Sequence, residues 1–179
     1  MRGLEKLFPP VAFVATWFKQ LAANNGCKIQ ITDKLRTNAE EKALYANSRE
    51  SLETINTLRK ARRNDTVFAK KWLANAKDAT QSYRGYGLAF DWVLIDPVNG
   101  KAVYDRDPDF NKNKQKDRYE VAELTREISG LESGAFWSSS PDLPHCQMTF
   151  GLTVMDLKSG KRPPQWKEWV AASKLPIDL

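Results

Sequence analysis

The chain of 179 residues is poor in the side chains that most often bind metals or form cross-links. It has one histidine, His145, and two cysteines, Cys27 and Cys146. A disulfide framework, a cysteine-rich metal centre and a histidine-rich metal centre are therefore excluded. A Ser–His or Cys–His nucleophilic pair could be built only around His145.

Long hydrophobic runs are also missing. No stretch reaches about 18 uninterrupted apolar residues, so no membrane span is expected. The short apolar run near the start is broken by Pro9-Pro10, and no signal peptide is expected. A length of 179 residues with 41% apolar and 28% charged residues predicts one globular domain with a substantial core.

Positive charge exceeds negative charge, because 28 Lys and Arg against 22 Asp and Glu give a net charge of +6. The excess is concentrated in residues 59–71 and 101–118. Solvated helix faces are the simpler interpretation of such runs, and the binding alternative would be nucleic acid or the anionic polymers of a bacterial wall. A nucleic-acid-binding domain is disfavoured, because the chain has no evident reading helix or RNP-like aromatic pattern.

The spacing of the apolar residues predicts an α+β fold, with hairpins in place of alternating βαβ units. Helices are predicted over residues 9–25, 37–47, 116–129 and 165–172, with a polar, helix-prone stretch over 50–76. Strands are predicted over residues 27–32, 88–95, 101–104 and 145–152. We therefore expect a single compact domain over 1–179, with a small mixed or antiparallel sheet flanked by helices and a basic helical insertion at about 49–79.

Two carboxylates stand out against this pattern. Asp91 is a charged residue inside the apolar strand predicted over 88–95, and a buried carboxylate normally needs a partner or a metal. Asp142 lies three residues before His145, at the end of a loop rich in Ser and Pro. Taken alone, a lone histidine is more often structural than a ligand, and an aspartate at this spacing is common by chance.

Three regions of the chain, in order, carry a more specific pattern. Residues 31–46 contain Ile31-Thr32-Asp33, Arg36-Thr37 and Leu44-Tyr45-Ala46. Residues 82–91 fit S-x-H-x-x-G-x-A-x-D at every fixed position except Arg84, and residues 142–151 fit D-x-P-H followed by Q-M-T-F-G. Together they resemble the zinc peptidases of bacterial and phage origin that cut peptidoglycan stem peptides, namely the L-alanyl-D-glutamate endopeptidases and the related D,D-carboxypeptidases.

This resemblance implies a fold like that of Hedgehog and D,D-peptidase domains and a metal-assisted hydrolysis. Asp91 and His145 would be zinc ligands, and Asp142 would be the acid/base that moves the proton of the attacking water. Arg36 would hold a substrate carboxylate, and Ser82 would belong to the same substrate-binding set. The implied partner is a peptidoglycan stem peptide, and the protein is expected to be a monomer.

Arg84 stands where this family has its first histidine ligand. A guanidinium has no acceptor lone pair and stays protonated, so it cannot coordinate zinc. At ~4 Å and an effective dielectric constant of about 20, a unit positive charge repels a dication by roughly 8 kcal/mol. The sequence therefore predicts weak or absent zinc binding, with the guanidinium of Arg84 in the vacated space and paired with Asp91.

Two functions follow from the resemblance. The first is a peptidoglycan stem-peptide endopeptidase of the endolysin type, acting on the L-alanyl-D-glutamate or a related bond and impaired or inactivated by Arg84. The second is a non-catalytic cell-wall-binding or phage structural module that retains the peptide groove. The expected location is the host cytoplasm until release to the cell wall, or the phage particle.

Overall fold

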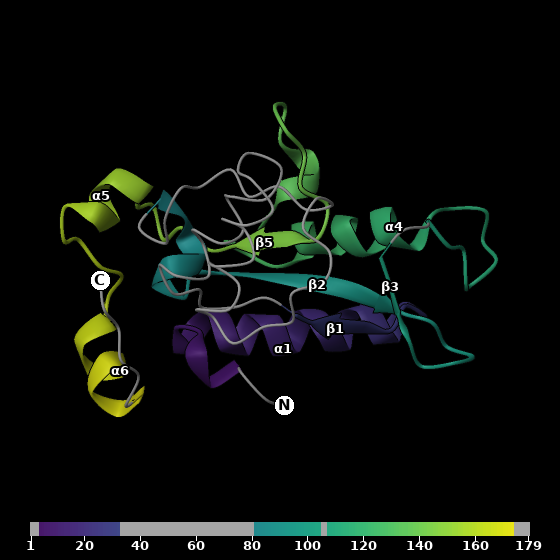
Figure 1. Ribbon diagram of the computed structural model, residues 1–179, viewed down its shortest axis with the longest axis horizontal. Coiled ribbons are helices and arrows are strands. Elements are labelled where there is room, and N and C mark those ends of the chain that lie inside the picture. Colours follow the sequence, from purple (N-terminus) through teal and green to yellow (C-terminus); the bar gives the residue numbers. More distant parts are fainter. Residues whose placement is uncertain (1–3, 33–80, 105–106, 174–179) are drawn as a thin grey trace, which may run out of the picture. The chain divides into compact units, whose positions relative to one another are not determined.

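The structure is a computed structural model that describes residues 4–32, 81–104 and 107–173 (Figure 1). Contacts divide the chain into two compact units, one of residues 1–34 and 87–150 and the other of residues 35–86 and 151–179. The helix predicted over 37–47 and the basic insertion at about 49–79 lie outside the described residues. The expectation of a single domain over 1–179 stays a prediction.

The first unit contains an antiparallel sheet. Its strands are β1 (Ile29–Ile31), β2 (Ala89–Ile95), β3 (Ala102–Val103), β4 (Glu132–Ser133) and β5 (His145–Gln147). Their order is β1-β2-β5-β4, and β3 also pairs with β2. In the β2–β5 pair Asp91 lies directly opposite His145, so the register of the sheet brings two predicted ligands side by side.

Helix α1 (Pro9–Asn24) confirms the first predicted helix. Two prolines occupy its first turn, where a missing backbone N–H costs nothing, and Gly26 has a φ of 81° just after the helix ends. Phe18 on its buried face contacts the rings of Phe90 and Trp92 on β2, with centroids 6.3 and 6.1 Å apart. Helix α1 therefore packs against the sheet, as Figure 1 shows.

The helix predicted over 116–129 is shorter than expected. It begins as α4 (Asp117–Glu123) and tightens into the 3₁₀ helix η4 (Leu124–Glu127). The Thr125 hydroxyl donates to the carbonyl of Ala122 at 2.7 Å, and Gly130 takes a φ of 78° two residues after Ile128. The change from α-helix to 3₁₀ helix and the left-handed backbone at Gly130 end the helical segment before the predicted limit.

The last strand is also shorter than the predicted 145–152. Strand β5 ends at Gln147, because Phe150 and Gly151 have φ values of 52° and 74° and turn the chain away. The stretch 130–144, predicted as a loop, contains strand β4 and the 3₁₀ helix η5 (Gly134–Phe136). Ser133 starts η5 by accepting the backbone N–H of Ala135.

The second unit contains the 3₁₀ helix η3 (Tyr83–Tyr86) and the helices α5 (Val154–Lys158) and α6 (Trp166–Ser173). Thr153 and Asp156 form a capping box at the start of α5. The Arg162 guanidinium lies over the rings of Tyr86 and Trp166, at 5.2 and 5.5 Å from their centroids. These contacts tie α6 to η3 within this unit.

The predicted α+β class with a small antiparallel sheet and flanking helices is confirmed. Within the part of the chain that the structure describes, no helix is both long enough and apolar enough to cross a membrane.

Candidate active site

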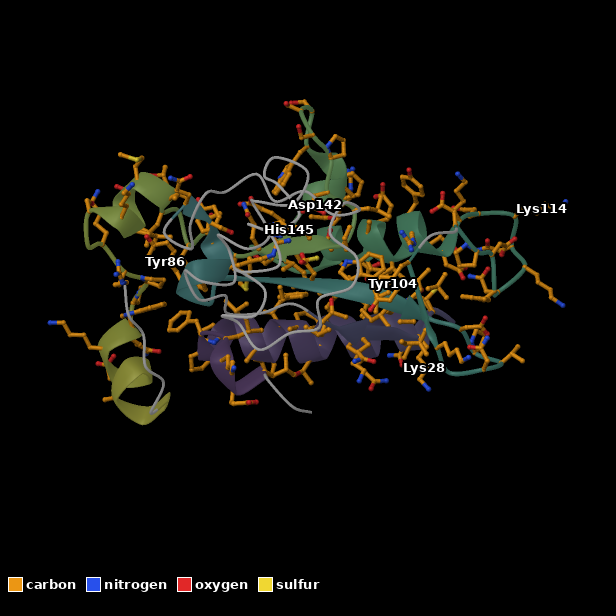
Figure 2. The ribbon with its side chains drawn as sticks, in the orientation of Figure 1. Lys28, Tyr86, Tyr104, Lys114, Asp142 and His145 are labelled. Carbon is orange, nitrogen blue, oxygen red and sulfur yellow. The ribbon has the colours of Figure 1, made fainter. Side chains whose placement is uncertain are left out.

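Three of the residues singled out from the sequence meet in the first unit. Asp91 comes from the middle of β2, His145 begins β5, and Asp142 lies in the loop that leads into β5. His145 Nδ1 lies 3.4 Å from Asp91 Oδ1, and one ligand atom from each of the three residues lies within 4.8 Å of the others. His145 and Asp142 are labelled together in Figure 2, near β5. We call these three residues the His145 cluster.

Tight backbone packing holds Asp142 beside His145. The Asp142 N–H donates to the Gly134 carbonyl at 2.9 Å, and the His145 N–H donates to the Asp142 carbonyl at 3.0 Å. A Cβ at position 134 would lie 2.6 Å from the Asp142 carbonyl oxygen and 3.1 Å from His145 Cβ. Gly134 is therefore the residue that allows η5 to approach the cluster so closely.

The ring of His145 is fixed by a chain of side chains that ends at the protein surface. His145 Nε2 lies 3.0 Å from Gln147 Oε1, and Gln147 Nε2 donates to Glu132 Oε2 at 2.9 Å. A carboxylate only accepts hydrogen bonds, so the Gln147 amide turns its NH₂ group towards Glu132 and its oxygen towards the imidazole. His145 Nε2 therefore carries the hydrogen, and its Nδ1 carries a lone pair when the ring is neutral.

The lone pair on His145 Nδ1 shows whether the site could hold a metal ion. His145 Nδ1 is buried and, among the residues that the structure describes, has no hydrogen-bond partner of acceptable geometry, although Asp91 Oδ1 lies only 3.4 Å away. A lone pair on a buried imidazole nitrogen is costly unless a donor or a cation fills the space beside it. His145 Nδ1 and the Asp91 carboxylate are donors that zinc accepts, so these two residues fit part of a zinc site, which normally has three protein ligands.

An aromatic side chain covers the imidazole. The indole of Trp137 lies with its centroid 5.0 Å from that of the His145 ring, at an interplanar angle of 50°. His145 itself is 2% exposed. Covering by an indole keeps bulk water from the ring and strengthens the electrostatic interactions within the cluster.

The other predicted site residues belong to the second unit. Ser82 accepts the backbone N–H of Arg84 at 3.3 Å at the start of η3, which is a structural contact. Arg84 lies within η3 and is half-buried, and its predicted pairing with Asp91 stays a prediction. Arg36 lies outside the described residues, so its predicted contact with a substrate carboxylate also stays a prediction.

Sequence reasoning did not assign roles to Gln147, Glu132, Gly134 or Trp137. Gln147 could have been found, because residues two apart in a strand share a face and His145 was already a candidate. Glu132 faces Gln147 across the β4–β5 pair, and β4 lies in a stretch predicted as a loop.

Comparison with known proteins gives one clear relative. No family model matches the chain. The chain is 30% identical over 142 residues to the peptidoglycan L-alanyl-D-glutamate endopeptidase CwlK of Bacillus subtilis (strain 168), and the alignment covers 79% of this chain and 73% of CwlK. Among solved structures, the L-Ala D-Glu endopeptidase ChiX of Serratia marcescens matches with a TM-score of 0.43 and 18% identity, over 82% of this chain and 84% of that one.

Proposed function

Because the chain belongs to the family of peptidoglycan L-alanyl-D-glutamate endopeptidases, we propose that it binds peptidoglycan stem peptides and hydrolyses a peptide bond in them. The observation that carries the proposal is the buried Nδ1 of His145, which faces the Asp91 carboxylate with the Asp142 carboxylate in reach. A buried imidazole nitrogen without a hydrogen-bond partner, with two carboxylates in reach, is an arrangement suited to binding a cation.

Asp91 and His145 would hold a zinc ion, which when bound supplies a Lewis acid and a water with a pKa lowered to about 7. Asp142 takes the proton of the attacking water and passes it to the leaving amine. Gln147 and Glu132 keep His145 in the tautomer whose Nδ1 can coordinate. Trp137 covers the imidazole and limits access of bulk water.

Arg84 is proposed to impair this activity. It stands where the resemblance expects a histidine ligand, and a guanidinium cannot take that place. The His145 cluster then offers one imidazole and carboxylates alone, and zinc is expected to bind weakly. A non-catalytic wall-binding module is the second candidate function, and Arg84 is the specific observation that favours it.

The setting of the activity is proposed from the motifs alone. We propose an endolysin-type role in bacterial lysis, with the protein held in the host cytoplasm until its release to the wall or carried in a phage particle. It would act as a monomer on stem peptides at the L-alanyl-D-glutamate or a related bond. Mass spectrometry of the peptides released from purified walls identifies the bond.

The experiment that tests the proposal measures the clearing of purified cell walls by the protein as given, by Arg84→His and by Arg126→His. Arg126 is exposed, is paired with Glu123 and stacks on the ring of Phe136, so its change to histidine is a matched control that replaces no member of the His145 cluster. Release of stem-peptide fragments by Arg84→His above the level of Arg126→His supports a peptidase. Wall binding without any released fragment from either variant would favour the binding module.

A further inference from the structure

Oxygen-bearing and basic side chains alternate in the segment that leads from β3 into α4. Asp109, Asn111, Asn113, Gln115 and Asp117 occupy the odd positions, and Lys112, Lys114 and Lys116 lie between them. The three lysines are exposed, and Lys114 lies at the outer end of this segment in Figure 2, well away from His145 in this view. Three of the basic residues in 101–118 therefore lie between side chains that offer oxygens.

The spacing of these oxygens matches that of a calcium-binding loop. Such loops follow D-x-[DN]-x-[DN]-G-x₅-E, with ligands at positions 1, 3, 5, 7, 9 and 12. Residues 109–120 place Asp109 first and Glu120 twelfth. The sixth position, usually glycine, is Lys114, and its φ of 71° is the left-handed conformation that glycine normally supplies. The chain therefore makes the required turn without the glycine.

Several of these side chains converge in the structure. The Asp109 carboxylate accepts the backbone N–H groups of Asn113 at 3.0 Å and of Lys114 at 2.9 Å. The side-chain amides of Asn111 and Asn113 both donate to the carboxylate of Glu120, the first at 3.2 Å. Positions 3 and 5 of the pattern thereby contact position 12, and position 1 is held to the backbone of positions 5 and 6.

Asp117, at position 9, gives an independent indication of a missing ligand. It is fully buried, and its Oδ2 accepts the N–H of Phe110 at 2.9 Å. Its Oδ1 has no hydrogen bond of acceptable geometry within the described parts of the chain, although the Cys27 thiol is close enough to interact with the carboxylate. A carboxylate oxygen of Asp117 lies within 4.8 Å of one from Glu120 and of the thiol of Cys27. A buried carboxylate oxygen without a partner is costly unless a cation occupies the space beside it.

We propose that residues 109–120 bind one calcium ion. Four residues supply side-chain oxygens, namely Asp109, Asn111, Asn113 and Glu120. The main-chain carbonyl of Gln115 is the fifth ligand, and Asp117 binds directly or through a water. Three carboxylates and neutral oxygens form the hard donor set that calcium prefers. The soft thiol of Cys27 lies beside this set and is not part of it.

Calcium would tie the loop to the start of α4, whose continuation η4 packs against α1. The test uses the full chain, stripped with a chelator and titrated with CaCl₂ in a calorimeter. We expect one ion per chain, with a Kd between about 10⁻⁶ and 10⁻³ M, and at least about tenfold weaker binding of MgCl₂. Saturating calcium should raise the melting temperature by about 5 °C. Absence of both effects would overturn the proposal.

Variants identify the ligands. Glu120→Gln should weaken calcium binding at least about tenfold, because position 12 supplies two of the oxygens. Glu123→Gln makes the same change three residues later, outside the pattern, and should leave the affinity unchanged. If both variants weaken calcium binding equally, the effect comes from the loss of one negative charge, and this result would contradict the proposed site. If Glu120→Gln does not fold, as judged by circular dichroism, Asp109→Asn provides the same test.

The variant Cys27→Ala distinguishes a calcium site made of oxygens from a metal site that uses the Cys27 thiolate. The affinity for calcium should be unchanged in this variant. Loss of binding, or a preference for zinc that disappears with Cys27, would contradict the proposal and assign the cluster to a softer metal. Every measurement here reads metal binding or stability, so the outcome is independent of whether the protein hydrolyses peptidoglycan.

Discussion

Two clusters of carboxylates lie in the same structural unit and are built in different ways. The His145 cluster takes its members from β2, from the loop before β5 and from β5 itself. The loop of residues 109–120 takes its members from one continuous segment. A site assembled by strand register depends on the whole sheet, whereas a site assembled by local spacing depends on one turn of the backbone.

The two clusters also differ in their chemistry. The His145 cluster combines an imidazole nitrogen with carboxylates, which suits a borderline ion such as zinc, whereas the loop offers oxygens alone. Burial raises the pKa of Asp117 and, with the charges of Asp117 and Glu120, raises the pKa of the Cys27 thiol to about 12. Asp156 lies outside both clusters and is paired with a lysine, since Lys161 Nζ lies 2.6 Å from its carboxylate.

The largest expected effect divides the roles within the His145 cluster. In the Arg84→His protein, Asp142→Ala should lower wall hydrolysis by about 10²–10⁴-fold and keep zinc, because Asp142 is assigned to proton transfer. Asp91→Ala should lose both, because Asp91 is assigned to coordination. Neither change should alter calcium binding by residues 109–120. Rates and metal content are measured on the same preparations, and loss of zinc from Asp142→Ala would make Asp142 a ligand.

The next effect concerns the side chains that orient His145. Gln147→Leu in the Arg84→His protein should lower zinc affinity about 10–100-fold, because the ring loses the acceptor that fixes its tautomer. Glu132→Gln keeps an acceptor for the Gln147 amide and should have a smaller effect. Competition with a chromogenic chelator measures both. An unchanged affinity in Gln147→Leu would show that the hydrogen bond to His145 Nε2 has no part in metal binding.

A smaller effect, on stability, is expected where η5 packs against Asp142. Gly134→Ala should lower the free energy of unfolding by about 1–3 kcal/mol, because its Cβ would lie 2.6 Å from the Asp142 carbonyl oxygen. Urea denaturation with and without calcium measures this change. Gly134 lies outside residues 109–120, so the stabilisation by calcium should be the same in both proteins, and a change in it would couple the two clusters.

The smallest effect concerns Asp156, whose carboxylate is paired with Lys161. The hydrogen bond from Lys161, followed by the contacts of Thr153, holds the pKa of Asp156 well below its usual range. A pKa lowered by folding contributes stability above the unfolded value of about 3.9, and this contribution is lost as the pH falls through the folded value. Asp156→Asn should therefore lower the melting temperature slightly at pH 7 and less in acid. A difference that grows as the pH falls would contradict this sign.

Local patterns in the sequence predicted the elements well and their ends poorly. Prolines at 9 and 10 and the apolar spacing after them located α1, because helix starts depend on neighbouring residues. The early ends of α4 and β5 depend on backbone angles at Gly130 and Phe150 that the periodicity of apolar residues does not record. Strand β4 has two residues, too few for any alternation to be recognised.

In the candidate site too, local patterns predicted some features and missed those that depend on strand pairing. Asp91, Asp142 and His145 were found from motifs, and the structure brings them together because the β2–β5 register pairs Asp91 with His145. The hydrogen bonds from His145 through Gln147 to Glu132 depend on a pairing between β4 and β5 that no local pattern predicts. The loop at 109–120 was interpreted only as a basic run, because its lysines were counted and the oxygens between them were not.

The most direct test of the account is the zinc content of the protein as given and of Arg84→His, both purified in buffer that contains zinc and then dialysed. Elemental analysis should find well under one zinc per chain in the former, because Arg84, which we propose stands in the place of a histidine ligand, cannot coordinate zinc. It should find one tightly held zinc per chain in Arg84→His. One tightly held zinc in the protein as given, or none in Arg84→His, would contradict the assignment of Asp91, His145 and position 84 to a single metal site.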